Sequence, residues 1–184
     1  MGDNNQTTTN SVSRKTVFCA LCIALCVVLP FAFHSIPNGG SIFSPIHIPV
    51  LLCGLICGWQ YGLACGIGGV LLSHVITSMP PMAYMPPMLV ECAVYGLVCG
   101  LGMRFFRTGK TLLDLYLSLI ASMLLGRIIA GIAKALIFSR GAISMQIWVT
   151  SYFVTALPGI VLHLILVPAL VMILMRAKLV SQRY

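Results

Sequence analysis

The sequence has 184 residues, of which 59% are hydrophobic and only 8% are charged. Soluble domains carry about 25% charged residues, so this composition excludes a water-soluble globule and predicts one compact domain embedded largely in lipid. The net charge of +8 would favour nucleic acid in a soluble protein. Here most basic residues lie at the ends of apolar runs, where they are better explained as topology signals.

Polar residues at the start of the chain predict a disordered cytoplasmic tail, residues 1–13, before the first apolar run at 16–33. The Pro and Gly content of residues 34–45 predicts a loop. The second run, 46–58, is short for a bilayer, which needs about 20 residues of helix. Residues 59–61 (Trp-Gln-Tyr) predict an interfacial turn, because Trp and Tyr favour the headgroup region.

Four more apolar runs follow, at 62–77, 88–103, 112–138 and 148–175. The segment 79–87 contains four prolines and is therefore predicted to lack a regular helix. Together the runs predict an all-α integral membrane bundle of six transmembrane helices, in which the second helix is the weakest prediction.

Basic residues gather at three places along the chain, residues 14–15, 104–110 and 176–183. With six spans all three places fall on one side, and the positive-inside rule assigns that side to the cytoplasm. We therefore expect a multi-pass domain over residues 14–178, a C-terminal tail over 179–184, and both termini in the cytoplasm.

Small residues are frequent in the apolar runs. All eight cysteines lie there, and we interpret them as packing residues rather than as a disulfide framework. Cys19 and Cys22 form a CxxC without a second pair or a nearby His, so no metal site and no cofactor are predicted. Glycines at four-residue spacing allow close helix packing, and we expect the first series to belong to two helices. They are Gly54, Gly58, Gly62 and Gly66, then Gly96 and Gly100.

Glu91, Arg127 and Lys134 lie inside predicted spans, where a charge costs at least about 2.5 kcal/mol and usually faces a cavity or a partner. Glu91 begins the fourth span, and Arg127 and Lys134 share nearly one face of the fifth. One interpretation is a polar cavity in which Arg127 or Lys134 receives an anionic or carbonyl group. The other is a structural Glu91–Arg127 pair. The cavity is favoured because one acid cannot neutralise two bases, although Lys134 can also extend to the outer surface.

The histidines give a weaker signal. The sequence has no HExxH motif and no paired spacing, which leaves metal catalysis without support. His74 and His163 are more simply explained as hydrogen-bonded structural residues. His47 adjoins the loop at 34–45 and is as readily a site residue as a structural one.

Asn38, Trp148 and Tyr152 are candidates for hydrogen bonding to, and stacking on, a small ligand, because pockets are mostly apolar with a few placed polar groups. The two aromatic residues fit an interfacial belt equally well. The sequence has neither a GxxxxGK[ST] nor a GxSxG motif, and it therefore contains no recognisable site for ATP hydrolysis.

The first apolar run contains Ala20 and Ala24 in an AxxxA arrangement. This pattern resembles the first helix of the S-components of energy-coupling factor (ECF) transporters, small six-span proteins that capture vitamins. In that family the motif docks a transmembrane coupling subunit. The cysteines beside the two alanines are small enough to keep such a face flat.

Two longer blocks resemble one branch of the same family. Residues 43–54 (FSPIHIPVLLCG) resemble its first loop and second helix. Residues 79–87, with Glu91 and the Tyr-Gly pair at 95–96, resemble its third loop and fourth helix. The resemblance covers nearly all of residues 14–178.

The resemblance implies a bacterial plasma-membrane protein that is not itself an enzyme. It would bind a water-soluble vitamin from outside, beneath the loops at 34–45 and 79–87, and then associate with a coupling subunit and two ATPases. The family is thought to topple in the membrane to deliver its substrate. The branch implies pantothenate, or a pyridoxine- or hydroxymethylpyrimidine-like compound. A carboxylate would suit Arg127 and a neutral ring would suit Glu91, and pantothenate is slightly favoured.

Two other classes of function stay open. An intramembrane enzyme would need converging titratable groups, for which Glu91, Arg127 and His163 are the only plausible set, and no motif orders them. A noncatalytic assembly subunit would use the same charges only to hold its helices together.

Overall fold

The structure of the chain is a computed structural model that describes residues 3–33, 39–138, 146 and 149–180, with the backbone alone for 3–11, 41, 137–138 and 151–152. Every regular element in these residues is a helix, so the all-α prediction is confirmed. Five helices are long and apolar enough to cross a membrane. They are α1 (Asp3–Ala32), α4 (Trp59–Thr77), α5 (Met85–Phe105), α6 (Thr111–Ala133) and α8 (Leu157–Arg176).

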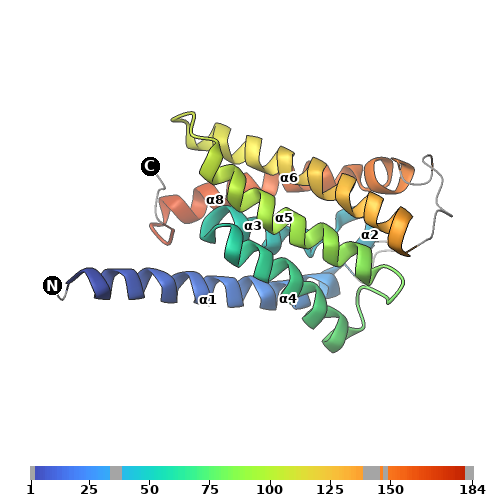
Figure 1. Ribbon diagram of the computed structural model, residues 1–184, viewed down its shortest axis with the longest axis horizontal. Helices are drawn as coiled ribbons and strands as arrows, with labels where there is room; N and C mark the ends of the chain where they lie inside the picture. Colours follow the sequence, from blue (N-terminus) through green and yellow to red (C-terminus); the bar gives the residue numbers. More distant parts are fainter. Residues whose placement is uncertain (1–2, 34–38, 139–145, 147–148, 181–184) are drawn as a thin grey trace.

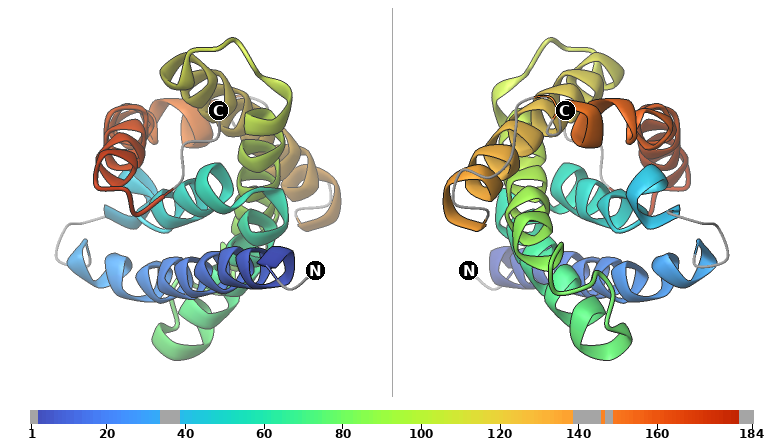
Figure 2. Two further views of the ribbon diagram at one scale, coloured as in Figure 1. Left: turned by 90° about the vertical axis from the view of Figure 1, so that its left-hand side faces the viewer. Right: turned by 90° about the vertical axis from the view of Figure 1, so that its right-hand side faces the viewer.

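The second predicted span forms a short helix inside the bundle. After α2 (Gly39–Phe43), helix α3 (His47–Cys57) has 11 residues, which corresponds to about 16 Å. All of them except Ile56 are buried, because α3 packs against α1, α4, α5, α6 and α8. In the end-on views α3 lies in the middle of the other helices (Figure 2). The prediction of six spans is thus supported only in part, by five long helices and the enclosed α3.

The turn between α3 and α4 consists of Gly58 alone. Its φ of 97° lies in the left-handed region that favours glycine. The predicted interfacial turn at 59–61 is therefore wrong, since these residues already form the first turn of α4.

The remaining boundaries follow from proline and from the polar residues. Pro86 and Pro87 occupy the first turn of α5, where a missing N–H breaks no intrahelical hydrogen bond, so α5 begins earlier than predicted. The fifth span continues as a π-helix, η1 (Lys134–Phe138), and η2 (Thr150–Val154) precedes α8. Helix α1 begins at Asp3, within the tail for which the sequence predicted disorder.

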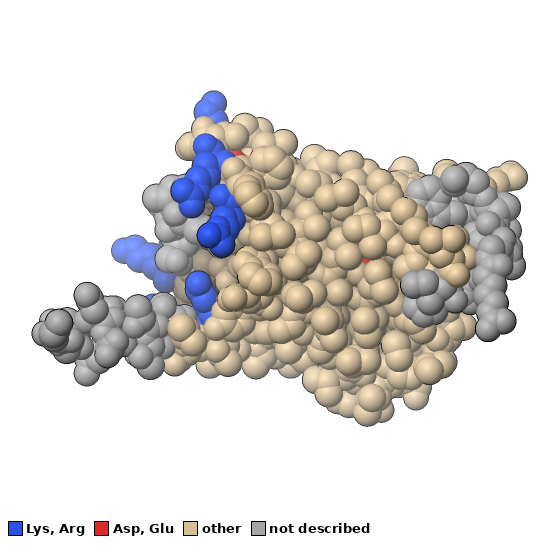
Figure 3. All heavy atoms as spheres, in the orientation of Figure 1, with Lys and Arg blue, Asp and Glu red and all other residues tan. Residues whose placement is uncertain are grey.

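The helices run along one long axis in alternating directions (Figure 1). The start of α1, the α5–α6 turn and the end of α8 lie at one end, and α2 and the α4–α5 connection lie at the other. Lys and Arg side chains gather at the first end (Figure 3). We call it the basic end, and the other the opposite end. The exposed basic residues there are Arg14, Lys15, Arg104, Arg107, Lys110, Arg176 and Lys178.

Glycine allows α3, α4 and α5 to touch backbone to backbone. A Cβ atom on Gly54 would lie 2.7 Å from the Gly96 carbonyl oxygen, and Cβ atoms on Gly62 and Gly96 would each collide with the other's backbone. The first glycine series does belong to two helices, as expected. All eight cysteines are buried and none forms a disulfide, which agrees with their interpretation as packing residues.

Candidate functional site

Five polar residues meet inside the bundle, each at most 7% exposed. We call them the buried polar cluster, and they come from α3, α5, α6 and α8. The members are His47, Glu91, Tyr95, Arg127 and His163. Sequence reasoning had placed three of them in the candidate site: His47, Glu91 and Arg127.

The hydroxyl of Tyr95 joins the two charged members of the cluster. It donates a hydrogen bond to Glu91 Oε1 at 2.6 Å and accepts one from Arg127 Nε at 3.0 Å. Arg127 Nε itself lies 4.0 Å from Glu91 Oε1. The Glu91–Arg127 pair that the sequence left open is therefore present, with Tyr95 as its bridge.

Local sequence explains why these groups converge. Glu91 and Tyr95 are four residues apart on α5 and so lie on the same helix face. On α6, Gly126 leaves room for the Tyr95 ring, because a Cβ atom there would collide with it. The next residue, Arg127, donates its Nε–H to the Tyr95 hydroxyl.

The guanidinium of Arg127 has one further neighbour and one open position. Its Cζ atom lies 5.9 Å from the centre of the Phe153 ring, a cation–π contact from η2. Its Nη1 atom has no hydrogen-bond partner within the part of the chain that the structure describes. A buried guanidinium nitrogen without a partner is a position at which a ligand oxygen can bind.

The two histidines lie beside this pair. The His47 ring meets the Tyr95 ring edge-on, with centres 4.9 Å apart, and lies 5.7 Å from the His163 ring. The backbone of Phe43 and Ser44 lies near the His163 ring, but no contact there has hydrogen-bond geometry. Among the described residues, none of the four ring nitrogens of the two histidines has a hydrogen-bond partner. The cluster thus combines an ion pair bridged by Tyr95 with five polar atoms that have no hydrogen-bond partner among the described residues.

The other predicted site residues are not members of the cluster. Lys134 Nζ is 5.8 Å from the centre of the Tyr84 ring on the α4–α5 connection, and its charge also acts on the Glu91 carboxylate. Asn38 and Trp148 fall outside the described residues, and Tyr152 belongs to η2, for which only the backbone is described at that position.

Sequence reasoning missed Tyr95 as a site residue and did not include His163. The four-residue spacing from Glu91 was the signal that could have found Tyr95, since a hydroxyl there must face the same way as the carboxylate. No local signal marks His163, which joins the cluster only when α8 packs on α3.

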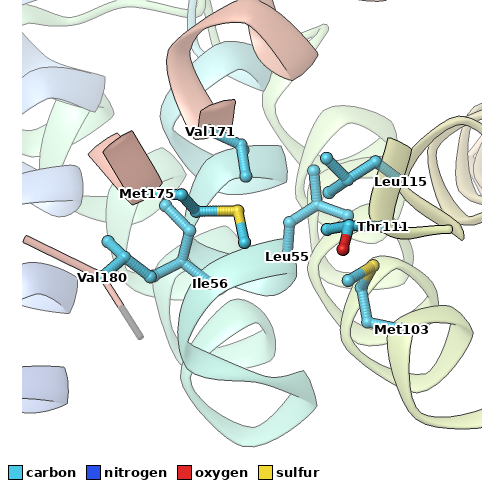
Figure 4. A pocket seen from close by; sticks show the side chains of 8 residues that line it. All are labelled: Leu55, Ile56, Met103, Thr111, Leu115, Val171, Met175 and Val180. Carbon is cyan, nitrogen blue, oxygen red and sulfur yellow. The ribbon is translucent and has the colours of Figure 1, made fainter. Parts of the chain in front are cut away.

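A cavity near the basic end is not the site. It has a volume of about 20 Å³ and is lined almost entirely by apolar side chains from α3, α5, α6, α8 and the segment that follows α8 (Figure 4). Thr111 is the one polar residue among them. This volume is about that of one water molecule, far too small for a vitamin.

The AxxxA face of α1 points away from the bundle. Ala20 and Ala24 are exposed, whereas Cys19, Cys22 and Cys26 on the same helix are buried. None of the described residues covers this face, so it is open to contact with lipid or another protein.

Comparison with known proteins identifies the family. The family model described as "ECF transporter, substrate-specific component" matches residues 14–174. Comparisons with curated proteins and with solved structures returned no match. Proteins of the matched family are transport subunits rather than enzymes, and the apolar helices fit a multi-pass membrane protein. The resemblance seen in the sequence is confirmed, and the chain belongs to the substrate-specific components of ECF transporters.

Proposed function

We propose that this subunit binds a water-soluble vitamin or vitamin precursor for import, and that the buried polar cluster forms part of its binding site. The observation that carries the proposal is the set of polar atoms on Arg127, His47 and His163 that have no hydrogen-bond partner among the described residues. Each buried polar atom without a partner costs about 1–3 kcal/mol. A bound substrate would supply the missing partners.

The position of the cluster supports capture from outside. Glu91 lies near the start of α5, Arg127 near the end of α6, and His47 and His163 near the starts of α3 and α8. All four helix ends concerned lie toward the opposite end of the bundle (Figure 1). The basic end is the cytoplasmic one by the positive-inside rule, with both termini inside, so the cluster belongs to the outer half.

Arg127 favours a substrate with a carboxylate. Its Nε atom is used by Tyr95, but Nη1 can donate a charge-assisted hydrogen bond. This is our reason to favour pantothenate slightly over a pyridoxine- or hydroxymethylpyrimidine-like compound. Lys134, Asn38, Trp148 and Tyr152 remain predicted contacts of the same substrate.

Native mass spectrometry of the gently purified protein tests the proposal. We expect one small molecule per chain, released on denaturation and identified by its mass as pantothenate or a pyridoxine-like compound. A noncatalytic assembly subunit is the second candidate, supported by the internal pairing of Glu91 with Arg127 through Tyr95. An empty protein whose melting temperature no vitamin raises would favour that candidate.

Docking to a coupling subunit is expected at the exposed Ala20–Ala24 face, with two ATPase subunits completing the importer. Ala20→Trp should abolish uptake in cells while the purified subunit keeps its substrate affinity, because the indole prevents close helix contact without entering the bundle. Leu124→Trp, on the exposed face of α6, is the matched control and should transport normally. Normal uptake by Ala20→Trp would exclude this face as the docking site.

A further inference from the structure

The histidine pair offers a different kind of hydrogen bonding from the arginine beside it. His47 is 3% exposed and His163 is fully buried, and both lie close enough to Arg127 to interact with it electrostatically. A positive charge on either imidazole, out of water and beside Arg127, would be very costly, so both imidazoles are neutral. A neutral imidazole carries one N–H donor and one acceptor nitrogen. Together the pair presents two donors and two acceptors.

This mixture restricts what can satisfy the pair. A carboxylate only accepts hydrogen bonds and an ammonium group only donates them, so either would leave half of the pair unsatisfied. A metal ion is disfavoured, because no set of three ligand residues within the described residues could hold one. Hydroxyl and amide groups both donate and accept, and they match the pair.

We infer that His47 and His163 form an uncharged subsite that binds a hydroxyl or amide group of the substrate, separate from the subsite at Arg127 Nη1. The inference rests on the proposed function and narrows it. The substrate then carries at least one hydroxyl or amide group in addition to whatever group meets Arg127. His163, which sequence reasoning left outside the site, becomes a specificity-determining residue.

The test replaces His163 with Phe, which keeps a flat ring of similar size and removes both nitrogens. Three compounds serve as probes: pantothenate, its neutral alcohol analogue pantothenol, and pyridoxine. For whichever of them the wild-type protein binds, His163→Phe should weaken binding about tenfold or more in calorimetry, the loss expected for one buried hydrogen bond. His163→Gln, which still donates and accepts, should retain part of the affinity.

If His163 had a purely structural role, His163→Phe would lower the melting temperature of the ligand-free protein. We expect no such loss, because the nitrogens of His163 have no hydrogen-bond partner among the described residues. Ser118→Ala is the matched control: it removes a buried hydroxyl that, like the His163 nitrogens, has no partner among the described residues. Ser118 lies closer to the basic end, and its replacement should leave binding unchanged.

The outcomes separate the inference from the proposed function. If the wild-type protein binds one of the compounds, and His163→Phe and His163→Gln bind it with the same affinity, the inference is overturned and the proposed function stands. A marked loss of melting temperature in both empty variants also overturns it, in favour of a structural histidine. A wild-type protein that binds none of the three compounds and retains no small molecule overturns both.

Discussion

Arg127→Met is expected to lower the free energy of unfolding by about 3–5 kcal/mol, because it removes one partner of a buried ion pair. Glu91 would keep its hydrogen bond from Tyr95. It would lose Arg127, whose Nε is the only positively charged group among the described residues within 4.0 Å of the Glu91 carboxylate. Thermal and denaturant unfolding in detergent micelles would measure the change. Arg104→Met, at the exposed basic end, is the control and should have little effect.

Replacing both partners should restore much of this stability. In the double variant Glu91→Gln/Arg127→Met the buried charge is gone, and the new amide side chain at position 91 can still accept a hydrogen bond from Tyr95. Removal of a whole buried ion pair is often close to neutral, whereas removal of half is not. The double variant therefore gives a folded protein that lacks Arg127.

Binding by that double variant tests whether the Glu91–Arg127 pair also helps to hold the substrate. If Arg127 also receives the substrate, the double variant should be stable and should bind pantothenate at least about tenfold more weakly than the wild type, as expected for one lost charge-assisted hydrogen bond. Unchanged affinity in a stable double variant would leave Arg127 with a structural role alone. Equal stability of the single and double variants would contradict the pairing itself.

Sequence patterns were sufficient for the architecture because length and hydropathy determine it. Five of the runs are long helices, and the basic residues near their ends gather at one end of the bundle (Figure 3). The exception is α3, whose 11 residues are too few for a lipid-exposed span. Since its neighbours surround it, the usual requirement for about 20 apolar residues does not apply to it.

The candidate site was only partly accessible from sequence. Charges in apolar runs stand out, so Glu91 and Arg127 were recognised together with the pairing between them. Tyr95 does not stand out in such a composition, although it makes both hydrogen bonds that join the pair. His163 and His47 are more than a hundred residues apart in the sequence, and only the packing of α8 on α3 brings their rings to 5.7 Å. Pairwise contacts of this kind have no local pattern to reveal them.

The glycine junction gives the other large effect: Gly96→Ala should destabilise the fold by about 3 kcal/mol or more, at or above the upper end of overpacking costs. A Cβ atom at Gly96 would collide with the carbonyl group of Gly62. The Cβ atom would be fixed to one helix backbone and the carbonyl group is part of the other, so no side-chain rotation can relieve the collision. Helices α4 and α5 would have to separate. Size-exclusion profiles and melting temperatures in detergent would show the loss.

Gly68→Ala on α4 is the matched control for this change. The new methyl group would lie 3.5 Å from Ile23 Cδ1, an ordinary contact, and alanine is favoured over glycine in helices by about 0.5–1 kcal/mol. We therefore expect unchanged or slightly raised stability. If both variants were equally damaging, glycine would matter here for helix flexibility rather than close packing. If neither variant were damaging, α4 and α5 would not be in backbone contact at Gly62 and Gly96.

Close contact also holds α3 against α5, since Gly54 meets Gly96 at the same junction. Loss of the junction should thus weaken substrate binding at the His47 subsite even where the variant still folds.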